Sequence, residues 1–260
     1  MKLCGKKYLI TGASSGLGLA IVARLMKIKG TQITAVARNM DALAEFSNVF
    51  PLSIDVSEPN AVDFMIDESI RQMGGIDCVI TCAGFGYYES FQGKDYEHIE
   101  AIFRTNVLSP LYTLQCVLEK TAGKLSFVLI SSMLGKFGFP GMALYSATKH
   151  ALHGFHDSFI HEKPNRLHFM TAYPIGMDTN FWNHMPKNIP LPRPLQSADK
   201  AAVAILDGLR KNKQTVYTWQ LSQLTLSVNH VIPIFFPAYK YFYKQCFQKW
   251  RKLTNEGDLF

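Results

Sequence analysis

The fold is decided near the start of the chain, where residues 8–18 read Tyr8-Leu9-Ile10-Thr11-Gly12-Ala13-Ser14-Ser15-Gly16-Leu17-Gly18. The apolar run at residues 8–10 predicts a short β-strand. Apolar residues then recur at helical spacing and predict a helix over residues 17–27. The glycines between these segments allow a tight turn and a close approach of helix to strand. The free N–H groups at the start of the helix could therefore bind a phosphate.

Strand-like and helix-like segments alternate along the chain, which implies βαβ units. Ser57 and Ser197 are expected to cap the helices that follow them. We predict an α/β fold with a doubly wound parallel sheet and helices on both faces, formed by residues 1–213, and a separate C-terminal segment over residues 214–260. Further strands are predicted at residues 32–37, 49–54, 77–82, 125–130, 167–172 and 216–217, and further helices at 61–73, 97–118, 145–160 and 198–211.

Composition narrows the classes of protein that the chain can represent. Its 260 residues, 48% of them hydrophobic, suffice for one large α/β domain with a buried core. The net charge is +7, but both signs are mixed over residues 1–213 and only residues 240–252 gather basic residues without an acid, so nucleic-acid binding is not expected. Five irregularly spaced cysteines and a start without a signal peptide favour reduced thiols and a cytoplasmic location.

Four histidines, His150, His153, His156 and His161, lie within one predicted helical stretch. The first three spread over about 120° of helix surface, and no set of carboxylate partners is evident beside them. We interpret them as structural and expect no metal site.

The glycine-rich loop has the spacing Gly-x-x-x-Gly-x-Gly. Together with Thr11 it resembles the Thr-Gly-x-x-x-Gly-x-Gly loop of the short-chain dehydrogenase/reductase family, and the resemblance covers about residues 6–212. It implies a Rossmann-type catalytic domain that binds a nicotinamide dinucleotide. Cys82 and Ile175 depart from the family pattern, which has Asn and Gly there. The implied cofactor-binding residues are Gly12, Ser14, Ser15, Gly16, Leu17, Gly18, Arg38, Asp55, Val56, Cys82, Ala83, Gly84, Asn106, Tyr145, Lys149, Pro174 and Thr179.

The end of the second predicted strand bears on the choice between NAD(H) and NADP(H). An acidic residue there would bond an unphosphorylated ribose and repel a 2′-phosphate. Residues 35–39 contain no acid, and Arg38 could pair with the 2′-phosphate while Ser14 adds a hydroxyl. We therefore expect NADP(H). The alternative is that Arg38 is a solvated residue at the start of a helix.

Tyr145 and Lys149 carry the catalytic prediction, because they are four residues apart and share one face of a predicted helix. A free Tyr has a pKa near 10, and a neighbouring ammonium is expected to lower it, so that the phenol can exchange a proton with a substrate oxygen. In the family, this Lys also bonds the nicotinamide ribose, a Ser holds the substrate oxygen, and an Asn holds a water that links the Lys to solvent. Ser132, thirteen residues before Tyr145, and Asn106 match these two.

These residues predict an oxidoreductase that transfers hydride between NADP(H) and a carbonyl or alcohol. An apolar pocket rim favours a lipophilic substrate. Two alternatives stay open, a non-catalytic NADP(H)-binding regulator or scaffold at a membrane, and an NAD-linked alcohol oxidase. A homo-oligomer is expected, because the family helix that holds the Tyr and Lys usually packs against a partner subunit. The predicted rim residues are Phe85, Tyr87, Tyr88, Met133, Leu134, Phe139, Met142, Phe181 and Trp182.

The C-terminal segment has an unusual composition. Residues 214–239 contain no Asp, Glu, Lys or Arg, but Pro233, Pro237, Asn229 and His230 argue against a membrane-spanning helix. Beyond Pro237 the pattern predicts a basic amphipathic helix, which could lie in the cytosolic interface of a membrane, cap the substrate site or pack in a dimer. Its apolar residues are Tyr239, Phe242, Tyr243, Cys246, Phe247, Trp250 and Leu253, and its basic residues are Lys240, Lys244, Lys249, Arg251 and Lys252.

Overall fold

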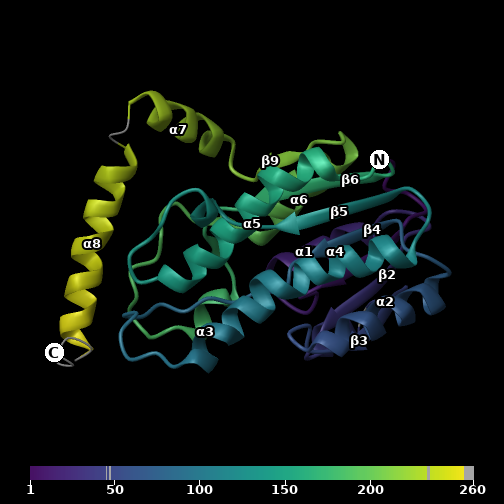
Figure 1. Ribbon diagram of the computed structural model, residues 1–260, viewed down its shortest axis with the longest axis horizontal. Coiled ribbons are helices and arrows are strands. Elements are labelled where there is room, and N and C mark those ends of the chain that lie inside the picture. Colours follow the sequence, from purple (N-terminus) through teal and green to yellow (C-terminus); the bar gives the residue numbers. More distant parts are fainter. Residues whose placement is uncertain (45, 47, 233–234, 255–260) are drawn as a thin grey trace.

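A computed structural model describes residues 1–44, 46, 48–232 and 235–254 of the chain. Seven strands form one sheet in the order β3-β2-β1-β4-β5-β6-β9, and every neighbouring pair is parallel (Figure 1). The predicted α/β fold is thus confirmed. The strands are β1 (Lys7–Thr11), β2 (Gln32–Ala37), β3 (Val49–Ser53), β4 (Cys78–Thr81), β5 (Leu125–Ile130), β6 (Leu167–Tyr173) and β9 (Thr215–Tyr217), while β7 (Met177–Asp178) and β8 (Gln196–Ser197) form a small second sheet.

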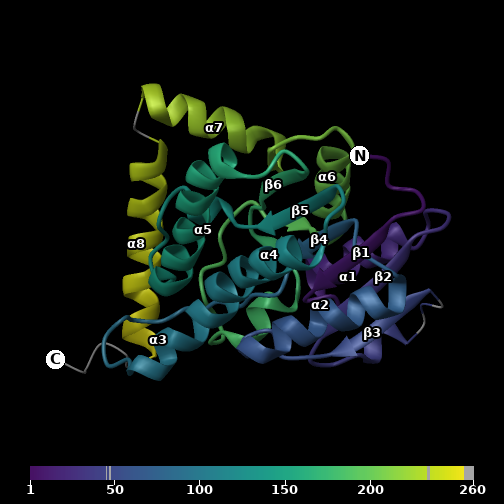
Figure 2. The same cartoon turned by 45° about the vertical axis from the view of Figure 1, so that its right-hand side comes forward.

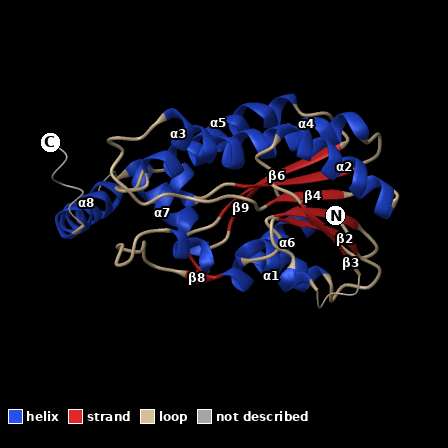
Figure 3. Ribbon diagram, turned by 90° about the horizontal axis from the view of Figure 1, so that it is seen from below, coloured by secondary structure: helices blue, strands red, loops and turns tan. Residues whose placement is uncertain are grey.

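Helices cover both faces of the sheet, as Figure 3 shows from the side. The helices are α1 (Gly16–Leu25) and α6 (Ala198–Arg210) on one face, and α2 (Pro59–Met73), α4 (Ser109–Lys120) and α5 (Ala143–Glu162) on the other. Side chains alternate along each strand, so successive residues enter different cores. Tyr8 and Ile10 belong to the core beneath α1 and α6, whereas Leu9 between them belongs to the core beneath α2, α4 and α5.

The chain order in the sheet reverses between β1 and β4. Strands to one side of this point are β2 and β3, and those to the other side are β5, β6 and β9. The loops that follow β1 and β4 therefore diverge at the carboxyl edge of the sheet and leave room between them. This is where ligands bind in doubly wound folds.

Two local predictions need correction. The helix predicted over 97–118 is α3 (Tyr96–Phe103), a π-helical turn (Arg104–Leu108) and α4 in succession. Ser57 is not a helix cap, because Glu58 holds the N-cap position of α2 and the Ser57 hydroxyl donates to Asp55 Oδ1 at 2.7 Å. Ser197 does cap α6, since its Oγ accepts a hydrogen bond from Lys200 N at 3.3 Å.

The C-terminal segment forms α7 (Gln220–Val231) and α8 (Phe235–Leu253), which stand at the end of the molecule opposite β3 (Figures 1 and 2). Part of the apolar side of α8 packs on the rest of the fold, where Tyr243 and Trp250 are buried in one cluster with Tyr88 and Phe139. Phe242 and Leu253, predicted on that same side, are exposed.

In the described part of the chain no helix is long and apolar enough to cross a membrane. Pro233 and residues 255–260 lie outside the described residues.

Candidate active site

The glycine-rich loop turns sharply at the end of β1. Gly12 adopts a φ of +64°, and a Cβ there would lie 2.7 Å from Ala83 N, so no side chain fits between the loops after β1 and β4. A hydrogen bond from Ala83 N to Thr11 Oγ1, 3.2 Å long, joins the same two loops. The first loop is thereby held against the second, with the start of α1 beside them.

The N-terminus of α1 is suited to an anion. Ser15 occupies the N-cap position in extended conformation, and among the described residues its side chain accepts no capping hydrogen bond. The first turn of α1 contains no acidic residue. Its N–H groups and the helix dipole therefore favour a phosphate, which fits the dinucleotide that the loop motif implies.

A cavity of about 530 Å³ runs from this loop along the carboxyl edge of the sheet. It brings together the predicted cofactor residues and the predicted catalytic residues, with the exception of Asn106. Cys82 and Ile175, which depart from the family pattern, also line it. Predicted residues on its wall are Gly12, Ser14, Ser15, Gly16, Leu17, Gly18, Arg38, Asp55, Val56, Cys82, Ala83, Gly84, Ser132, Tyr145, Lys149, Pro174 and Thr179.

Arg38 lies at the rim of this cavity directly after β2. Its side chain is 80% exposed, and its Nη1 is 3.8 Å from Asp55 Oδ2. An exposed ion pair of this length contributes little stability and can rearrange at little cost. The guanidinium is therefore accessible to a phosphate group that enters the cavity.

Ser132 and Tyr145 meet at the inner part of the cavity. Ser132 follows β5 and caps a short 3₁₀ turn, where its Oγ accepts a hydrogen bond from Leu134 N at 3.1 Å. Tyr145 lies in the first turn of α5, and its side chain lines the same part of the cavity as Ser132. A ligand oxygen bound in this part of the cavity can therefore meet both hydroxyls.

Lys149 lies one helical turn after Tyr145 and is buried. Its Nζ donates to the carbonyl oxygen of Ile130 at 3.0 Å and lies 5.6 Å from the centre of the Tyr145 ring. The end of β5 therefore holds the ammonium near the phenol, as the Tyr-x-x-x-Lys spacing implied.

Burial controls the protonation of both groups. It raises the pKa of Tyr145 to about 12, because burial desolvates the phenolate and the nearby Ser132 hydroxyl offsets only part of this effect. The lowered pKa that the sequence predicted for this phenol is therefore wrong for the structure as it stands. Burial lowers the pKa of Lys149 to about 8. Tyr145 is thus a neutral hydrogen-bond donor at neutral pH, and Lys149 is mainly a cation.

Asn106 lies in the π-helical turn and is buried behind the cavity wall. Its Oδ1 accepts from Phe85 N at 3.0 Å, while its Nδ2 donates to Phe85 O at 2.8 Å and to Thr148 Oγ1 at 3.2 Å. A Cβ on Gly84 would lie 3.0 Å from Asn106 Oδ1. Asn106 therefore positions the loop after β4, a role that the sequence analysis did not predict.

The far end of the cavity is apolar and aromatic. Six of the nine predicted rim residues line it: Phe85, Met133, Leu134, Met142, Phe181 and Trp182. The other three do not. Tyr88 and Phe139 are buried beneath α8, and Tyr87 stacks on His98.

Sequence reasoning missed the contribution of the C-terminal helices to this cavity. Trp219, Ser222 and Thr225 from the start of α7, and Phe236 and Tyr239 from α8, complete the apolar end. The charge-free stretch 214–239 was the available signal, since such a run needs a surface to cover it.

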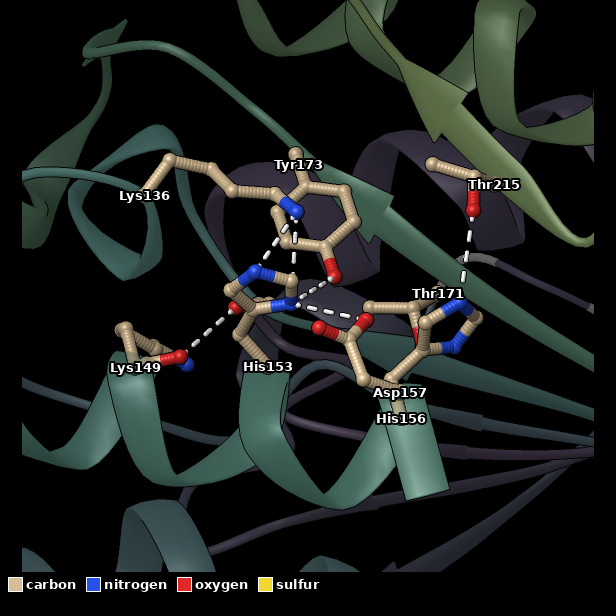
Figure 4. A network of polar contacts seen from close by, with 9 residues as sticks. Lys136, Lys149, His153, His156, Asp157, Thr171, Tyr173 and Thr215 are labelled. Atoms are coloured by element: carbon tan, nitrogen blue, oxygen red, sulfur yellow. Dashed lines mark hydrogen bonds and ion pairs between the residues drawn. The ribbon is translucent and has the colours of Figure 1, made fainter. Parts of the chain in front are cut away.

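Two of the four histidines of α5, His153 and His156, make structural contacts (Figure 4). His156 connects two strands, with Nδ1 2.9 Å from Thr171 Oγ1 and Nε2 3.3 Å from Thr215 Oγ1. His153 Nε2 lies 2.7 Å from Lys136 Nζ. Burial lowers the pKa of both imidazoles, which favours their neutral forms. In the described ranges no three His, Cys, Asp or Glu residues are grouped so that they could hold a metal ion.

Comparison with known proteins decides the family. Residues 6–189 match the family model described as short chain dehydrogenase. The chain belongs to the short-chain dehydrogenase/reductase family. It is therefore an oxidoreductase of this family with a nucleotide-binding Rossmann fold.

Two relatives within the short-chain dehydrogenase/reductase family are named for one kind of substrate. The 3-dehydrosphinganine reductase of Danio rerio is 27% identical over 263 residues, which cover 90% of this chain and 78% of that protein. The 3-ketodihydrosphingosine reductase of Mus musculus is 30% identical over 197 residues, which cover 69% of this chain and 58% of that protein. The chain thus spans less than two thirds of the mouse relative.

A solved structure shows the same fold over the whole chain. The short-chain dehydrogenase from Streptomyces avermitilis has a TM-score of 0.75 and 23% identity, with 98% of this chain and 99% of that chain covered. At this identity the likeness establishes the fold alone. The C-terminal helices are included in the covered length.

Proposed function

We propose that this protein is an NADPH-dependent reductase of a ketone carried on a lipophilic, long-chain molecule. The observation that carries the proposal is the continuity of one cavity. It joins the start of α1 and Arg38 to the Ser132–Tyr145 pair and ends between aromatic side chains of the catalytic domain and of α7 and α8. A dinucleotide, a reacting carbonyl and an apolar tail therefore have adjoining places.

Residues from the end of the cavity beside α1 to its middle would hold NADPH. The N–H groups at the start of α1 would bind the pyrophosphate, and Arg38 would pair with the 2′-phosphate. When bound, NADPH supplies the hydride that is added to the carbonyl carbon. Lys149 is expected to bond the nicotinamide ribose, as in the family that the chain resembles.

Tyr145 and Ser132 act on the carbonyl oxygen. Both hydroxyls donate hydrogen bonds to it and stabilise the negative charge that develops as the carbonyl π electrons move onto oxygen. Tyr145 then transfers its proton to that oxygen, which completes the alcohol and leaves a phenolate. The ammonium of Lys149 stabilises this phenolate electrostatically.

The raised pKa of Tyr145 fits its role as the proton donor. A phenol with a pKa of about 12 is protonated at neutral pH, so Tyr145 can give its proton to the substrate oxygen.

The apolar end of the cavity supports the substrate class. Phe181 and Trp182 lie near Tyr145, with ring centres of Tyr145 and Phe181 5.4 Å apart, and Phe236 and Tyr239 lie farther along the wall. An alkyl chain bound among these rings would lose its contact with water. The names of the two relatives, 3-dehydrosphinganine reductase and 3-ketodihydrosphingosine reductase, describe a ketone of this kind.

The experiment measures NADPH oxidation with 3-dehydrosphinganine and, as a matched control, with 2-butanone, which has the ketone but no long chain. We expect turnover with the long-chain ketone and a much lower kcat/KM with 2-butanone. Tyr145→Phe should lower kcat by about 10²–10⁴-fold, because it removes the proton donor, and leave NADPH binding nearly unchanged. Wild-type turnover in Tyr145→Phe, or none with any lipophilic ketone, would refute the proposal.

A further inference from the structure

The outer side of α7 is an exposed aliphatic stripe. Leu221, Leu224 and Val228 are 50%, 58% and 47% exposed, and Ile232 just beyond the helix is 54% exposed. Their spacing places them on one flank of the helix. The helix contains no Asp, Glu, Lys or Arg. Large aliphatic side chains gathered in this way on a charge-free surface are typical of a site that binds another protein or a membrane.

Other residues at this end of the chain face inward. Trp219, Ser222 and Thr225 line the substrate cavity, and Ser222 is buried. Helix α7 therefore separates the apolar end of the cavity from the exterior by the thickness of one helix. The stripe and the cavity wall are two flanks of the same element.

Helix α8, which follows α7 in the chain, carries positive charge. Lys240, Lys244, Lys249 and Lys252 are exposed, and neither α7 nor α8 contains an acidic residue. Lys240 and Lys244 also line a groove between α8 and the start of α5. Tyr241 and Phe242 are 65% and 60% exposed among these lysines. Exposed aromatic and basic side chains together are typical of helices that lie at a lipid interface.

We propose that α7 and α8 dock this protein on the surface of an anionic lipid bilayer. The stripe of Leu221, Leu224 and Val228 would enter the boundary between head groups and acyl chains, and the lysines of α8 would bind anionic head groups. The charge favours a bilayer over a second copy of the chain. A second copy would present the same basic helix and repel it, whereas an anionic bilayer offers both apolar depth and negative charge.

This docking differs from the predicted mode, in which the apolar face of α8 itself would enter the membrane. Tyr243 and Trp250 of that face are buried against the rest of the fold, and Tyr239, Cys246 and Phe247 are half-buried. A consequence, which rests on the proposed function, is that a lipophilic substrate could pass beside α7 from the bilayer into the cavity. The docking itself does not depend on that function, and its test uses no turnover.

The test is flotation of the full chain with vesicles of phosphatidylcholine and phosphatidylserine and with vesicles of phosphatidylcholine alone. We expect binding to the anionic vesicles that weakens with salt. Leu224→Glu with Val228→Glu should lower the partition coefficient by about tenfold or more. The matched control is Phe64→Glu with Val203→Glu, which adds the same charge at exposed apolar positions on α2 and α6 and should leave binding unchanged.

Lysine variants test the electrostatic part. Lys244→Gln with Lys249→Gln should lower binding to anionic vesicles by about fivefold per residue, whereas Lys29→Gln with Lys124→Gln should not. Failure to bind anionic vesicles, or equal loss in the control pairs, would overturn the proposal. So would a concentration-dependent dimer that Val228→Glu dissociates in the absence of lipid, since the stripe would then be an interface between copies. Circular dichroism and NADPH binding of each variant report that it is folded.

Discussion

Asn106 holds the backbone of Phe85 by both of its polar groups, with Phe85 N donating to Asn106 Oδ1 at 3.0 Å and Asn106 Nδ2 donating to Phe85 O at 2.8 Å. The π-helical turn over Arg104–Leu108 widens the helix at the residue that makes this contact. The loop after β4, which forms one wall of the cavity, is therefore fastened to the helix layer by one buried amide.

Asn106→Ala should lower the free energy of unfolding by about 1–3 kcal/mol, because the amide groups of Phe85 lose their partner in a partly buried site. It should also weaken NADPH binding, since the loop lines the cavity. Urea unfolding and cofactor titration measure the two effects. Asn183→Ala, at an exposed position, is the control and should change stability by less than about 0.5 kcal/mol. Unchanged stability in Asn106→Ala would contradict the anchoring role.

Arg38→Ala should weaken NADPH binding by about 10–100-fold and leave NADH binding almost unchanged, because only NADPH carries the 2′-phosphate that the guanidinium would bond. Equilibrium titration with both cofactors measures the ratio. Arg210→Ala, which removes an exposed guanidinium far along α6, controls for net charge. An equal loss of affinity for both cofactors would show that Arg38 does not bind the 2′-phosphate.

Gly12→Ala should abolish cofactor binding and destabilise the fold, because the new Cβ would lie 2.7 Å from Ala83 N at a residue whose φ is +64°. Gly154→Ala is the matched control. No atom lies within 4 Å of its added Cβ, and it lies inside α5, so alanine should raise stability by about 0.5–1 kcal/mol. Thermal unfolding with and without NADPH separates the two variants. Equal melting temperatures would contradict the close packing at Gly12.

The pH dependence of kcat/KM should report the protonation state of Lys149. Burial lowers the pKa of its ammonium from 10.5 to about 8, so the cation that stabilises the Tyr145 phenolate is present below pH 8 and is lost as pH rises through 8. We expect kcat/KM for ketone reduction to fall above about pH 8. Lys149→Arg should move that fall to higher pH, because a guanidinium stays charged there. An alkaline limb that does not move in Lys149→Arg would assign it to another group.

Tyr243 fastens α8 to the loop that borders the cavity. Its hydroxyl accepts from Arg193 N at 3.0 Å and donates to Leu191 O at 3.1 Å, and Pro192 and Arg193 line the cavity. Tyr243→Phe should raise KM for a long-chain ketone several-fold while kcat with a short ketone is retained. Tyr241→Phe, at an exposed position on the same helix, should change neither. Loss of kcat with every ketone would point to a general loss of folding instead.

The candidate catalytic residues could be predicted from the sequence because their geometry is local. Tyr145 and Lys149 are one helical turn apart, and the glycines at 12, 16 and 18 belong to one turn between β1 and α1. A spacing along a helix or a turn translates directly into a position in space. Ser132 was predicted from its position thirteen residues before Tyr145, which matches the family pattern. It follows β5, whose carboxyl end lies at the same edge of the parallel sheet as that of β1.

Other features depend on contacts between distant segments, and no spacing reports them. Asn106 meets Phe85 across 21 residues, and Trp219 and Tyr239 reach the cavity from the far end of the chain. Packing against Tyr88 and Phe139 decides which side of α8 is covered and which side stays exposed. The pKa of Tyr145 also depends on contacts between distant segments, because these contacts decide how much water the assembled site excludes. The sequence by itself determined the local chemistry, and the tertiary structure decided burial and neighbours, since these arise only when the segments pack together.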